Sequence, residues 1–363
     1  MNVIEIYDFL HTIPEEGLQE FKTSAFLAEK LEKLGYKVER GVGKTGVVGT
    51  ISTGNPGPTV AIRADMDALK HLINGENILV HSCGHDAHSA MALTVAAELI
   101  NKIKKGTLKI LFQPAEETLS GALAMIEDGV LEDIDIMYGM HLRPIQEAAA
   151  GQAVSGLYHA AGSVLDVTIT GLTAHGARPH LGMSAIDAGA LAVLAVNSIK
   201  TNPVIPCSIK VTGFNAGGAA SNAIPDKATL VLDVRAQTNA AMQENLKRIH
   251  AAINNAALTN GCQATIVERA SVPAAELDSE LTKEMEEVIG EVLGEKGILP
   301  RIQTPGGEDF HYFVQKKPEL KAAYIGIGCD LKPGLHDPTM SFNKECLKDG
   351  VNIMVAAILK KLG

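Results

Sequence analysis

The chain has 363 residues, of which 46% are hydrophobic and 20% charged, a composition typical of a folded globular protein with more than one core. Its formal net charge of -10 argues against nucleic acid or an anionic membrane surface as the main partner, and no apolar run is long enough to span a bilayer. The first residues lack the basic start and apolar core of a secretory signal, and the five cysteines are few and scattered. We therefore expect a cytoplasmic protein with reduced thiols.

Alternating helices and strands are predicted for the first part of the chain. Apolar residues at helical spacing predict a helix over 16–34, which Gly35 ends. We then predict, in chain order, a buried strand over 59–62, a helix over 87–105, and strands over 107–112 and 134–140. Polar clusters follow these three strands. Because ligands of open α/β sheets bind beyond the carboxyl ends of the strands, we expect a functional site there.

The pattern changes after residue 162. The predicted elements are a strand over 163–170, a helix over 184–200, strands over 208–213 and 228–236, a helix over 240–257 and a strand over 263–269. This β-α-β-β-α-β order is that of a ferredoxin-like unit with one antiparallel sheet. Later we predict helices over 278–293 and 344–362 and a strand over 322–327. The expected fold is α/β, with a small α+β domain (163–272) inserted into a larger discontinuous domain (1–162 and 273–363).

Potential metal ligands are densest over residues 81–88, which contain three histidines, a cysteine and an aspartate. Cys83 and His85 flank one glycine, so both can face one ion, and nitrogen and thiolate donors suit borderline-soft divalent metals. The other interpretations are a surface turn with incidental histidines, or a cysteine nucleophile activated by histidine. The density of donors favours a metal site, and no orienting asparagine or oxyanion loop marks the nucleophile.

Two neighbouring carboxylates, Glu116 and Glu117, follow the strand over 107–112. They point in different directions, so one can bind metal while the other faces a water molecule. The alternative is a solvated acidic loop, but the apolar residues before them and the rigid Pro114 favour a fixed position.

Two isolated histidines complete the candidate set. His141 ends the strand over 134–140, and His336 precedes Asp337, which can orient a metal-bound imidazole. A single histidine in such a position is more often structural than metal-binding. Each of the two therefore supports a metal site only together with the other candidate ligands.

Asp65 and Asp67 follow the strand over 59–62. They either cap a turn or lie behind the metal ligands, where a carboxylate orients a ligand or tunes the metal-bound water. We expect the orienting role for Asp65 rather than for Asp67.

The inserted domain carries further polar candidates. His175 follows a strand, Asn222 lies in a glycine-rich segment and Arg235 ends a strand. In a structural interpretation, these residues simply belong to solvated turns and a solvated strand end. In a functional interpretation, the three side chains together bind a carboxylate or an oxyanion. Gly307, in a flexible turn, lets the backbone approach a ligand closely.

Seven motifs occur in order along the chain: His-Thr-Ile-Pro-Glu at 11–15, Arg-Ala-Asp-Met-Asp-Ala-Leu at 63–69, Cys-Gly-His-Asp at 83–86, Gln-Pro-Ala-Glu-Glu at 113–117, His141, Gly-Glu-Asp-Phe at 307–310 and Leu-His at 335–336. In this combination the chain resembles the co-catalytic metallopeptidase family that includes carboxypeptidase G, the aminoacylases and succinyl-diaminopimelate desuccinylase. The branch that it resembles most is that of the amidohydrolases of N-acyl amino acids, hippurate and auxin–amino acid conjugates.

The resemblance implies a mixed-sheet, three-layer αβα catalytic domain, with the inserted domain as a lid and dimerisation domain. It implies two divalent metal ions per subunit, with zinc, manganese, cobalt or nickel as candidates. The lid histidine would enter the partner subunit's site, and the lid asparagine and arginine would hold the substrate carboxylate or the oxyanion. The implied roles are metal ligands for Cys83, His85, Glu117, His141 and His336, general base and proton donor for Glu116, supporting carboxylate for Asp65, catalytic donor to the tetrahedral oxyanion for His175, and substrate contacts for Asn222, Arg235 and Gly307.

Several positions depart from the family pattern, among them Ser184 and Ala185 of the lid, which stand where Asp-Pro is more usual. Arg63 stands where many members have a histidine ligand, and Cys83 is the branch's substitute. Lys70 stands in place of a usual proline, and the segment 71–80 is short, so the resemblance does not carry over an acyl specificity.

The predicted reaction is metal-dependent hydrolysis of the amide bond of a small N-acyl amino acid. A dipeptidase or aminopeptidase on the same scaffold is one alternative, and it would require a free α-amine on the substrate. A catalytically silent metal-binding relative is another, but the presence of both Glu116 and the full ligand set argues against it.

Overall fold

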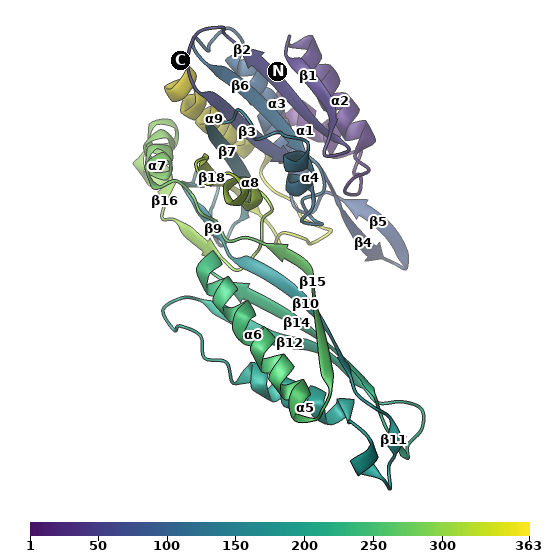
Figure 1. The fold of residues 1–363 in the computed structure, drawn as a ribbon. Coiled ribbons are helices and arrows are strands. Elements are labelled where there is room, and N and C mark those ends of the chain that lie inside the picture. The colour runs from purple at the N-terminus through teal and green to yellow at the C-terminus, as the bar shows by residue number, and fades with distance from the viewer. The chain divides into compact units, whose positions relative to one another are not determined.

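The computed structural model describes all residues from Met1 to Gly363, which form two compact units. Unit 1 comprises Met1–Tyr158, Glu276–Ile302 and Glu308–Gly363, and unit 2 comprises His159–Ala275 with Gln303–Gly307 (Figure 1). None of the helices combines the length and the apolar character that crossing a bilayer would require.

An eight-stranded mixed sheet lies at the centre of unit 1, in the order β1-β2-β6-β3-β7-β18-β8-β16. The four adjacent strands β6, β3, β7 and β18 run parallel, while β2 pairs antiparallel with both β1 and β6. The strand bounds are β1 Lys37–Val42, β2 Gly46–Ser52, β3 Thr59–Asp65, β6 Thr107–Gln113, β7 Ile136–Pro144, β8 Ala153–Val154, β16 Ile298–Leu299 and β18 Lys321–Leu331.

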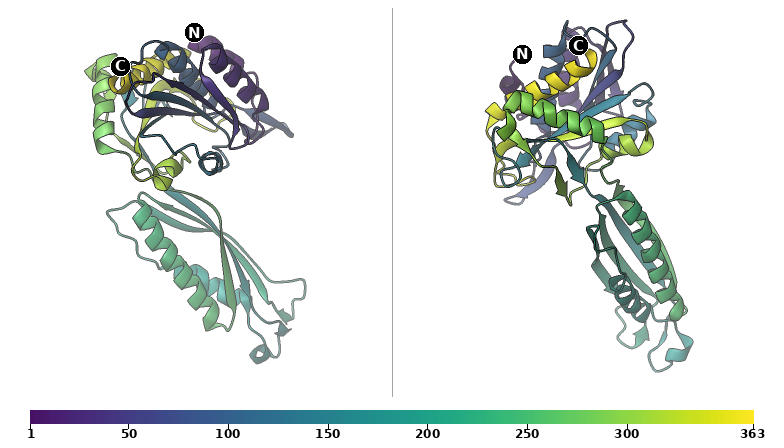
Figure 2. Two further views of the ribbon diagram at one scale, coloured as in Figure 1. Left: turned by 45° about the horizontal axis from the view of Figure 1, so that its top comes forward. Right: turned by 90° about the vertical axis from the view of Figure 1, so that its left-hand side faces the viewer.

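Helices cover both faces of this sheet (Figure 2). Five helices share one core with alternate strand residues such as Ile110, Tyr138 and Ile325, and the short helices α4 and α8 pack together on the other face. Strands buried on both faces are expected to be nearly continuous in apolar residues, as β7 is. The helix bounds are α1 Val3–Leu10, α2 Phe21–Lys33, α3 His85–Leu99, α7 Ser279–Leu293 and α9 Leu347–Leu362 on the first face, and α4 Gly121–Glu127 and α8 His311–Lys316 on the second.

Unit 1 also contains a two-stranded hairpin, β4 (Leu69–Ile73) with β5 (Glu76–Val80), that is not part of the large sheet. A second short pair joins β9 (Leu157–His159) to β17 (Ile302–Thr304). Three short 3-10 helices lie at Pro179–Leu181, Glu295–Gly297 and Lys344–Cys346.

Unit 2 is a four-stranded antiparallel sheet, in the order β12-β14-β10-β15, with two helices on one face. Alternate residues of the central strands, such as Leu165, Val167 and Leu232, form a separate core with the helices. A small pair of strands, β11 and β13, completes the unit. The bounds are β10 Ala161–Thr170, β11 Ala174–His175, α5 Ala185–Asn197, β12 Cys207–Ala216, β13 Ala223–Ile224, β14 Lys227–Ala236, α6 Asn239–Thr259 and β15 Gln263–Val272.

Three features of the structure differ from the sequence expectations. The helix expected over 87–105 ends at Leu99, because Ile100 is extended and Asn101 adopts a left-handed conformation with φ of 59°. The expectations contained no α1, β1, β2 or β4–β5 hairpin. Gln303–Gly307, expected in the larger domain, belongs to unit 2, where the backbone N–H of Ala160 donates to the carbonyl oxygens of both Thr304 and Gly306 at 3.0 and 3.1 Å.

Candidate metal centre and active site

The carboxyl ends of parallel strands bring the polar clusters of unit 1 together. β3 ends at Asp65 and β6 ends at Gln113, while His141 lies towards the end of β7. These three strands are neighbours in the sheet. The site therefore lies where open α/β sheets generally bind ligands.

Cys83 lies in the middle of the candidate metal ligands. Its Sγ is 3.5 Å from Nε2 of His141 and 3.4 Å from Nε2 of His336. The ligand atoms of Cys83, His85 and His141 lie within 4.8 Å of one another, and so do those of Cys83, Glu117 and His336. The five residues nominated from the sequence thus form two groups that share the thiol, an arrangement that suits two neighbouring cations.

The residue before His85 makes the approach of Cys83 to the helix possible. Gly84 has φ of 86°, a left-handed conformation that costs glycine little, and α3 begins at the next residue. A side chain at Gly84 would also meet Leu142 at 3.1 Å. Cys83 and His85 therefore face the same centre from either side of this turn.

His85 and Glu117 each have a buried polar atom with no protein partner. Nδ1 of His85 donates to the backbone oxygen and to Oδ1 of Asp67, both at 3.0 Å. Nε2 of His85 and Oε1 of Glu117 have no hydrogen-bond partner and lie 3.8 Å apart. Buried polar atoms of this kind are destabilising unless further groups pair with them, and divalent cations fit an imidazole nitrogen and a carboxylate oxygen.

The protonation of the other two buried candidate ligands, His141 and Cys83, also bears on cation binding. Burial lowers the pKa of His141 well below its ordinary value, so this imidazole is neutral, as a metal ligand must be. Its Nδ1 donates to the carbonyl of Leu142 at 2.7 Å, which leaves Nε2 towards Cys83. Burial raises the pKa of the Cys83 thiol well above its ordinary value, so a thiolate there requires a neighbouring cation.

His88, although close to the centre, has no free nitrogen for a metal. Its Nδ1 is 2.7 Å from Oδ1 of Asp65, and its Nε2 accepts the backbone N–H of Leu142 at 3.0 Å. His88 is therefore a structural histidine that links the end of β3 to β7.

The hydrogen bonds give the two aspartates different partners. Asp67, not Asp65, contacts Nδ1 of His85, and its Oδ2 also accepts the backbone N–H of Glu117 at 3.0 Å. Asp65 instead contacts His88 and Arg63, and its Oδ2 lies 3.9 Å from Nε2 of His85. Because β3 ends at Asp65, the chain turns after it, and Asp67 reaches the ligands from the loop.

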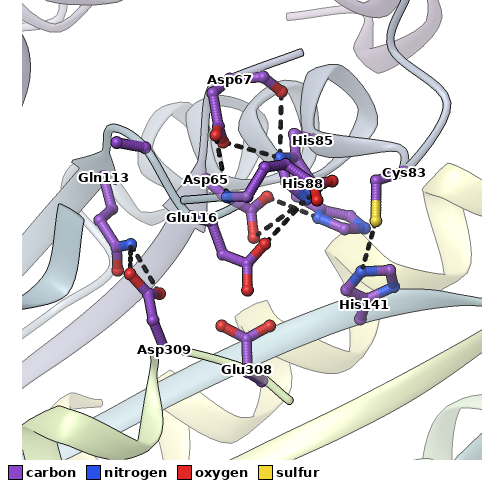
Figure 3. A network of polar contacts seen from close by, with 12 residues as sticks. Asp65, Asp67, Cys83, His85, His88, Gln113, Glu116, His141, Glu308 and Asp309 are labelled. Carbon is purple, nitrogen blue, oxygen red and sulfur yellow. Dashed lines mark hydrogen bonds and ion pairs between the residues drawn. The ribbon is translucent and has the colours of Figure 1, made fainter. Parts of the chain in front are cut away.

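Glu116 lies beside the metal groups but on the side of a second acidic cluster. Its Oε2 is 3.9 Å from Nε2 of His85, and it is only 7% exposed. Carboxylate oxygens of Glu116, Glu308 and Asp309 lie within 4.8 Å of one another (Figure 3). Burial raises the pKa of Glu116 well above its ordinary value, and the neighbouring Glu308 and Asp309 raise it further. Glu116 is therefore a carboxyl group that can hold a proton.

Arg63 supplies the positive charge for this acidic cluster. Its guanidinium is completely buried, and its nitrogens lie 2.7 Å from Asp65, 3.0 Å from Glu308 and 2.7 Å from Asp309. Gln113 accepts from Nε of the same guanidinium at 2.7 Å and donates to Asp309 at 2.8 Å. The arginine that stands where many family members have a histidine is thus the ion-pair partner of these carboxylates.

Sequence reasoning missed the roles of Arg63, Glu308, Asp309 and Gln113 in this network. The ion pair between Arg63 and Asp309 joins residues 246 positions apart, and nothing in the local pattern connects them. The one available signal was the charged Arg63 in an otherwise apolar buried strand, which requires a buried counter-charge.

In unit 2, the nominated substrate residues lie in two places. His175 pairs with Ala223 in the small β11–β13 sheet, and the N–H of Gly176 donates to the carbonyl of Asn222 at 2.7 Å. Arg235 lies near the other end of β14, eight residues after the strand begins at Lys227, and it forms an ion pair with Asp233 at 3.0 Å. Eight residues of strand span on the order of 26 Å, so the structure does not bring Arg235 together with His175 and Asn222.

Gly307 packs against β15 within unit 2. A side chain at this position would meet Val272 at 2.6 Å, so the glycine is required for this close approach. The structure shows no contact of Gly307 that would test a role in substrate binding.

Residues 61–360 match Peptidase family M20/M25/M40. The chain belongs to this family. It is 32% identical to a hippurate hydrolase of Campylobacter jejuni, over 97% of this chain and 94% of the relative. Among solved structures it is similar to a putative aminohydrolase from methicillin-resistant Staphylococcus aureus, with a TM-score of 0.91, 28% identity and coverage of 99% and 96% of the two chains.

A second solved structure bears on the metal centre. The Bacillus subtilis protein YXEP, described as a dinuclear metal binding peptidase from the M20 family, has a TM-score of 0.83 to this chain. The two are 25% identical, and the match covers 99% of this chain and 97% of the other. The family resemblance expected from the motifs is therefore confirmed, and so is the mixed α/β fold.

Proposed function

We propose that this member of the M20 family hydrolyses the amide bond between an acyl group and an amino acid, and that it requires two divalent metal ions per chain. The observation that carries this proposal is the position of Cys83 in two separate three-residue donor groups, with Glu116 directly beside them. The relative named hippurate hydrolase supports the substrate class.

The donor groups define the two proposed ion positions. Cys83, His85 and His141 would hold one ion, and Cys83 would hold the second together with Glu117 and His336. Divalent cations in such a centre lower the pKa of water and polarise a substrate carbonyl. The thiolate and imidazole ligands suit zinc, and manganese, cobalt or nickel fit the same donor set when available.

Glu116 is the proposed general base. Its buried carboxylate takes the proton of the attacking water and later returns it to the nitrogen of the leaving amino acid. The raised pKa of Glu116 favours the second step, while the positive charge of nearby cations favours the ionised form needed for the first. Arg63 keeps Glu308 and Asp309 in place around this carboxylate.

Unit 2 is proposed to provide the substrate contacts in a homodimer. Arg235 and Gly307 would contact the substrate carboxylate, and His175 and Asn222 would act in the site of the partner subunit. The separation of His175 and Asn222 from Arg235 along β14 supports contributions from two subunits. β12 is an edge strand of the unit 2 sheet and so has unpaired backbone groups available to a second copy.

A reducing cytoplasmic environment is part of the proposal. All five cysteines are free thiols in the structure, and Cys83 can act as a ligand only in the unoxidised form.

The proposal is tested with N-acetyl, N-benzoyl, N-succinyl and N-indoleacetyl amino acids, together with free dipeptides. We expect the metal-loaded protein to release amino acid from acylated substrates. We expect Glu116→Gln to bind both metal ions but to lose at least about 100-fold in kcat, since general-base catalysis contributes roughly that much. Glu319→Gln, a change of an exposed glutamate, is the matched control and should have no effect.

Two results would contradict the proposal. Near-normal turnover by a metal-loaded Glu116→Gln variant would exclude Glu116 as the base. Cleavage of dipeptides alone, with a requirement for a free α-amine, would make the protein a dipeptidase or aminopeptidase.

A further inference from the structure

The β4–β5 hairpin is inserted between two parts of the metal centre. It follows Asp67, which contacts His85, and it ends at Val80, just before Ser82 and Cys83. It forms its own two-stranded sheet and projects from the large sheet of unit 1 (Figure 1). An element with these two attachments can shape the surroundings of the centre without contributing a ligand.

The two faces of the hairpin differ in composition. Directly opposed residues of an antiparallel pair share a face, and His71 is opposite Ile78. Ile73, two residues beyond His71, lies on the same face, whereas Leu72 is opposite Asn77 on the other. The first face therefore carries four apolar side chains (Leu69, Ile73, Ile78 and Val80) together with His71 and, beside the turn, Glu76.

The face with His71 is the one attached to the metal centre. Nε2 of His71 lies 2.8 Å from Oγ of the buried Ser82, the residue before Cys83. The backbone oxygen of Ser82 accepts the N–H of His336 at 2.7 Å. Ser82 thus connects the hairpin to two of the proposed ligands.

Solvent reaches the centre on the same side. The side chain of His336 is 58% exposed, whereas that of Glu117 is 11% exposed and His85, Cys83 and His141 are buried. A substrate must therefore approach past His336. Ile78, which is 40% exposed, is the cross-strand neighbour of His71, and His71 and His336 both contact Ser82.

We propose that the face of the hairpin with His71, Ile73 and Ile78 is the acyl-selecting surface of the enzyme and receives an apolar acyl group. This inference depends on the proposed amide hydrolysis. The bound acyl chain would continue from the amide at the centre past His336 and onto Ile78 and Ile73. Burial of an apolar group against these side chains favours long aliphatic or aromatic acyl groups over acetyl.

Ile78→Ala is the test variant, and Leu72→Ala is its matched control. Both remove a large aliphatic side chain from the same hairpin, but Leu72 is on the opposite face and is 73% exposed. The measurements are kcat/KM for N-acetyl, N-hexanoyl and N-benzoyl derivatives of one amino acid, with metal content determined for every variant. The dissociation constants of the same compounds are measured by calorimetry in a Glu116→Gln background, which gives a readout without turnover.

We expect Ile78→Ala to lower kcat/KM, and to weaken binding, about tenfold for the hexanoyl and benzoyl compounds while changing the acetyl compound less than twofold. Leu72→Ala should change none of them. An equal effect on all three compounds, no effect, or the same effect from Leu72→Ala would overturn the hairpin proposal. If the wild type hydrolyses and binds none of the three compounds, the proposed function fails as well, so the two failures are distinguishable.

Discussion

The carboxylate of Asp67 joins His85 to Glu117. Its Oδ1 contacts Nδ1 of His85 and its Oδ2 accepts the backbone N–H of Glu117, both at 3.0 Å. In the proposed assignment His85 and Glu117 hold different ions, so one buried side chain would fix a ligand of each. This carboxylate also determines which nitrogen of His85 faces the metals.

Asp67→Asn should weaken metal binding about 10- to 100-fold, the usual effect of removing a group that orients a ligand. The amide has one oxygen, so it cannot accept from both His85 and Glu117. Competition with a chelator of known affinity measures the change. Asp133→Asn, a change of an exposed aspartate outside the site, is the control and should leave the affinity within about twofold. Equal metal affinity of Asp67→Asn and the wild type would show that Asp67 does not orient the ligands.

The shared thiol predicts a pattern of metal stoichiometry. Cys83→Ala should reduce bound metal at both positions, since Cys83 belongs to both donor groups. His141→Ala and His336→Ala should each reduce binding at one position and leave one tightly bound ion per chain. Elemental analysis after gel filtration measures the ratio of metal to protein. Loss of one ion in Cys83→Ala, with full retention of the other, would contradict a bridging thiolate.

Removal of Arg63 should destabilise the fold strongly. Arg63→Met leaves three buried carboxylates without their cation, so we expect a loss of about 3–5 kcal/mol in the free energy of unfolding. The exposed pair of Arg40 with Glu32 provides the control, and Arg40→Met should cost no more than about 1 kcal/mol. Urea denaturation of the metal-free proteins measures the free energy of unfolding of both variants and of the wild type. Equal stabilities of the two variants would show that the Arg63 network is not a structural requirement.

The hydrogen bond between His11 and Asp86 predicts a pH dependence of stability. Nδ1 of His11 lies 2.7 Å from Oδ2 of Asp86, and this contact raises the pKa of His11. A raised folded-state pKa means that the folded protein binds more protons, so stability falls as pH rises. The contribution is fully present below about pH 6.5, the ordinary value for histidine, and is lost as pH rises through the folded-state pKa.

The comparison of the wild type with His11→Gln measures this contribution. The wild type should be more stable than the variant at pH 5.5, and the difference should shrink towards pH 8.5. Urea midpoints at both pH values provide the test. A difference that is independent of pH would show that the charge on His11 does not contribute.

The sequence was sufficient to nominate the five metal ligands and Glu116. Cys83, His85, Glu116 and Glu117 lie in short, dense motifs, and each motif falls near a strand end or a helix start. Local spacing and the family resemblance together carry such information, and the structure shows the five proposed ligands lying together.

The residues and elements that surround the candidate ligands could not be predicted from the sequence in the same way. The choice between Asp65 and Asp67 depends on where the chain turns after β3, which spacing does not determine. The contacts of Arg63 with Glu308 and Asp309 depend on the packing of segments far apart in the chain. The β4–β5 hairpin was missed because its strands are only five residues long and the apolar residues of Leu69–Ile73 do not alternate with polar ones, although their burial does.

Metal removal and stepwise metal return, with hydrolysis measured at each step, test the central claim most directly. The protein is stripped with a chelator, zinc or manganese is added back in known amounts, and both bound metal and release of amino acid from an N-acyl amino acid are recorded. The account predicts no hydrolysis by the stripped protein and full recovery as the second ion per chain binds. Full hydrolysis by the metal-free protein, or no metal bound after reconstitution, would contradict it.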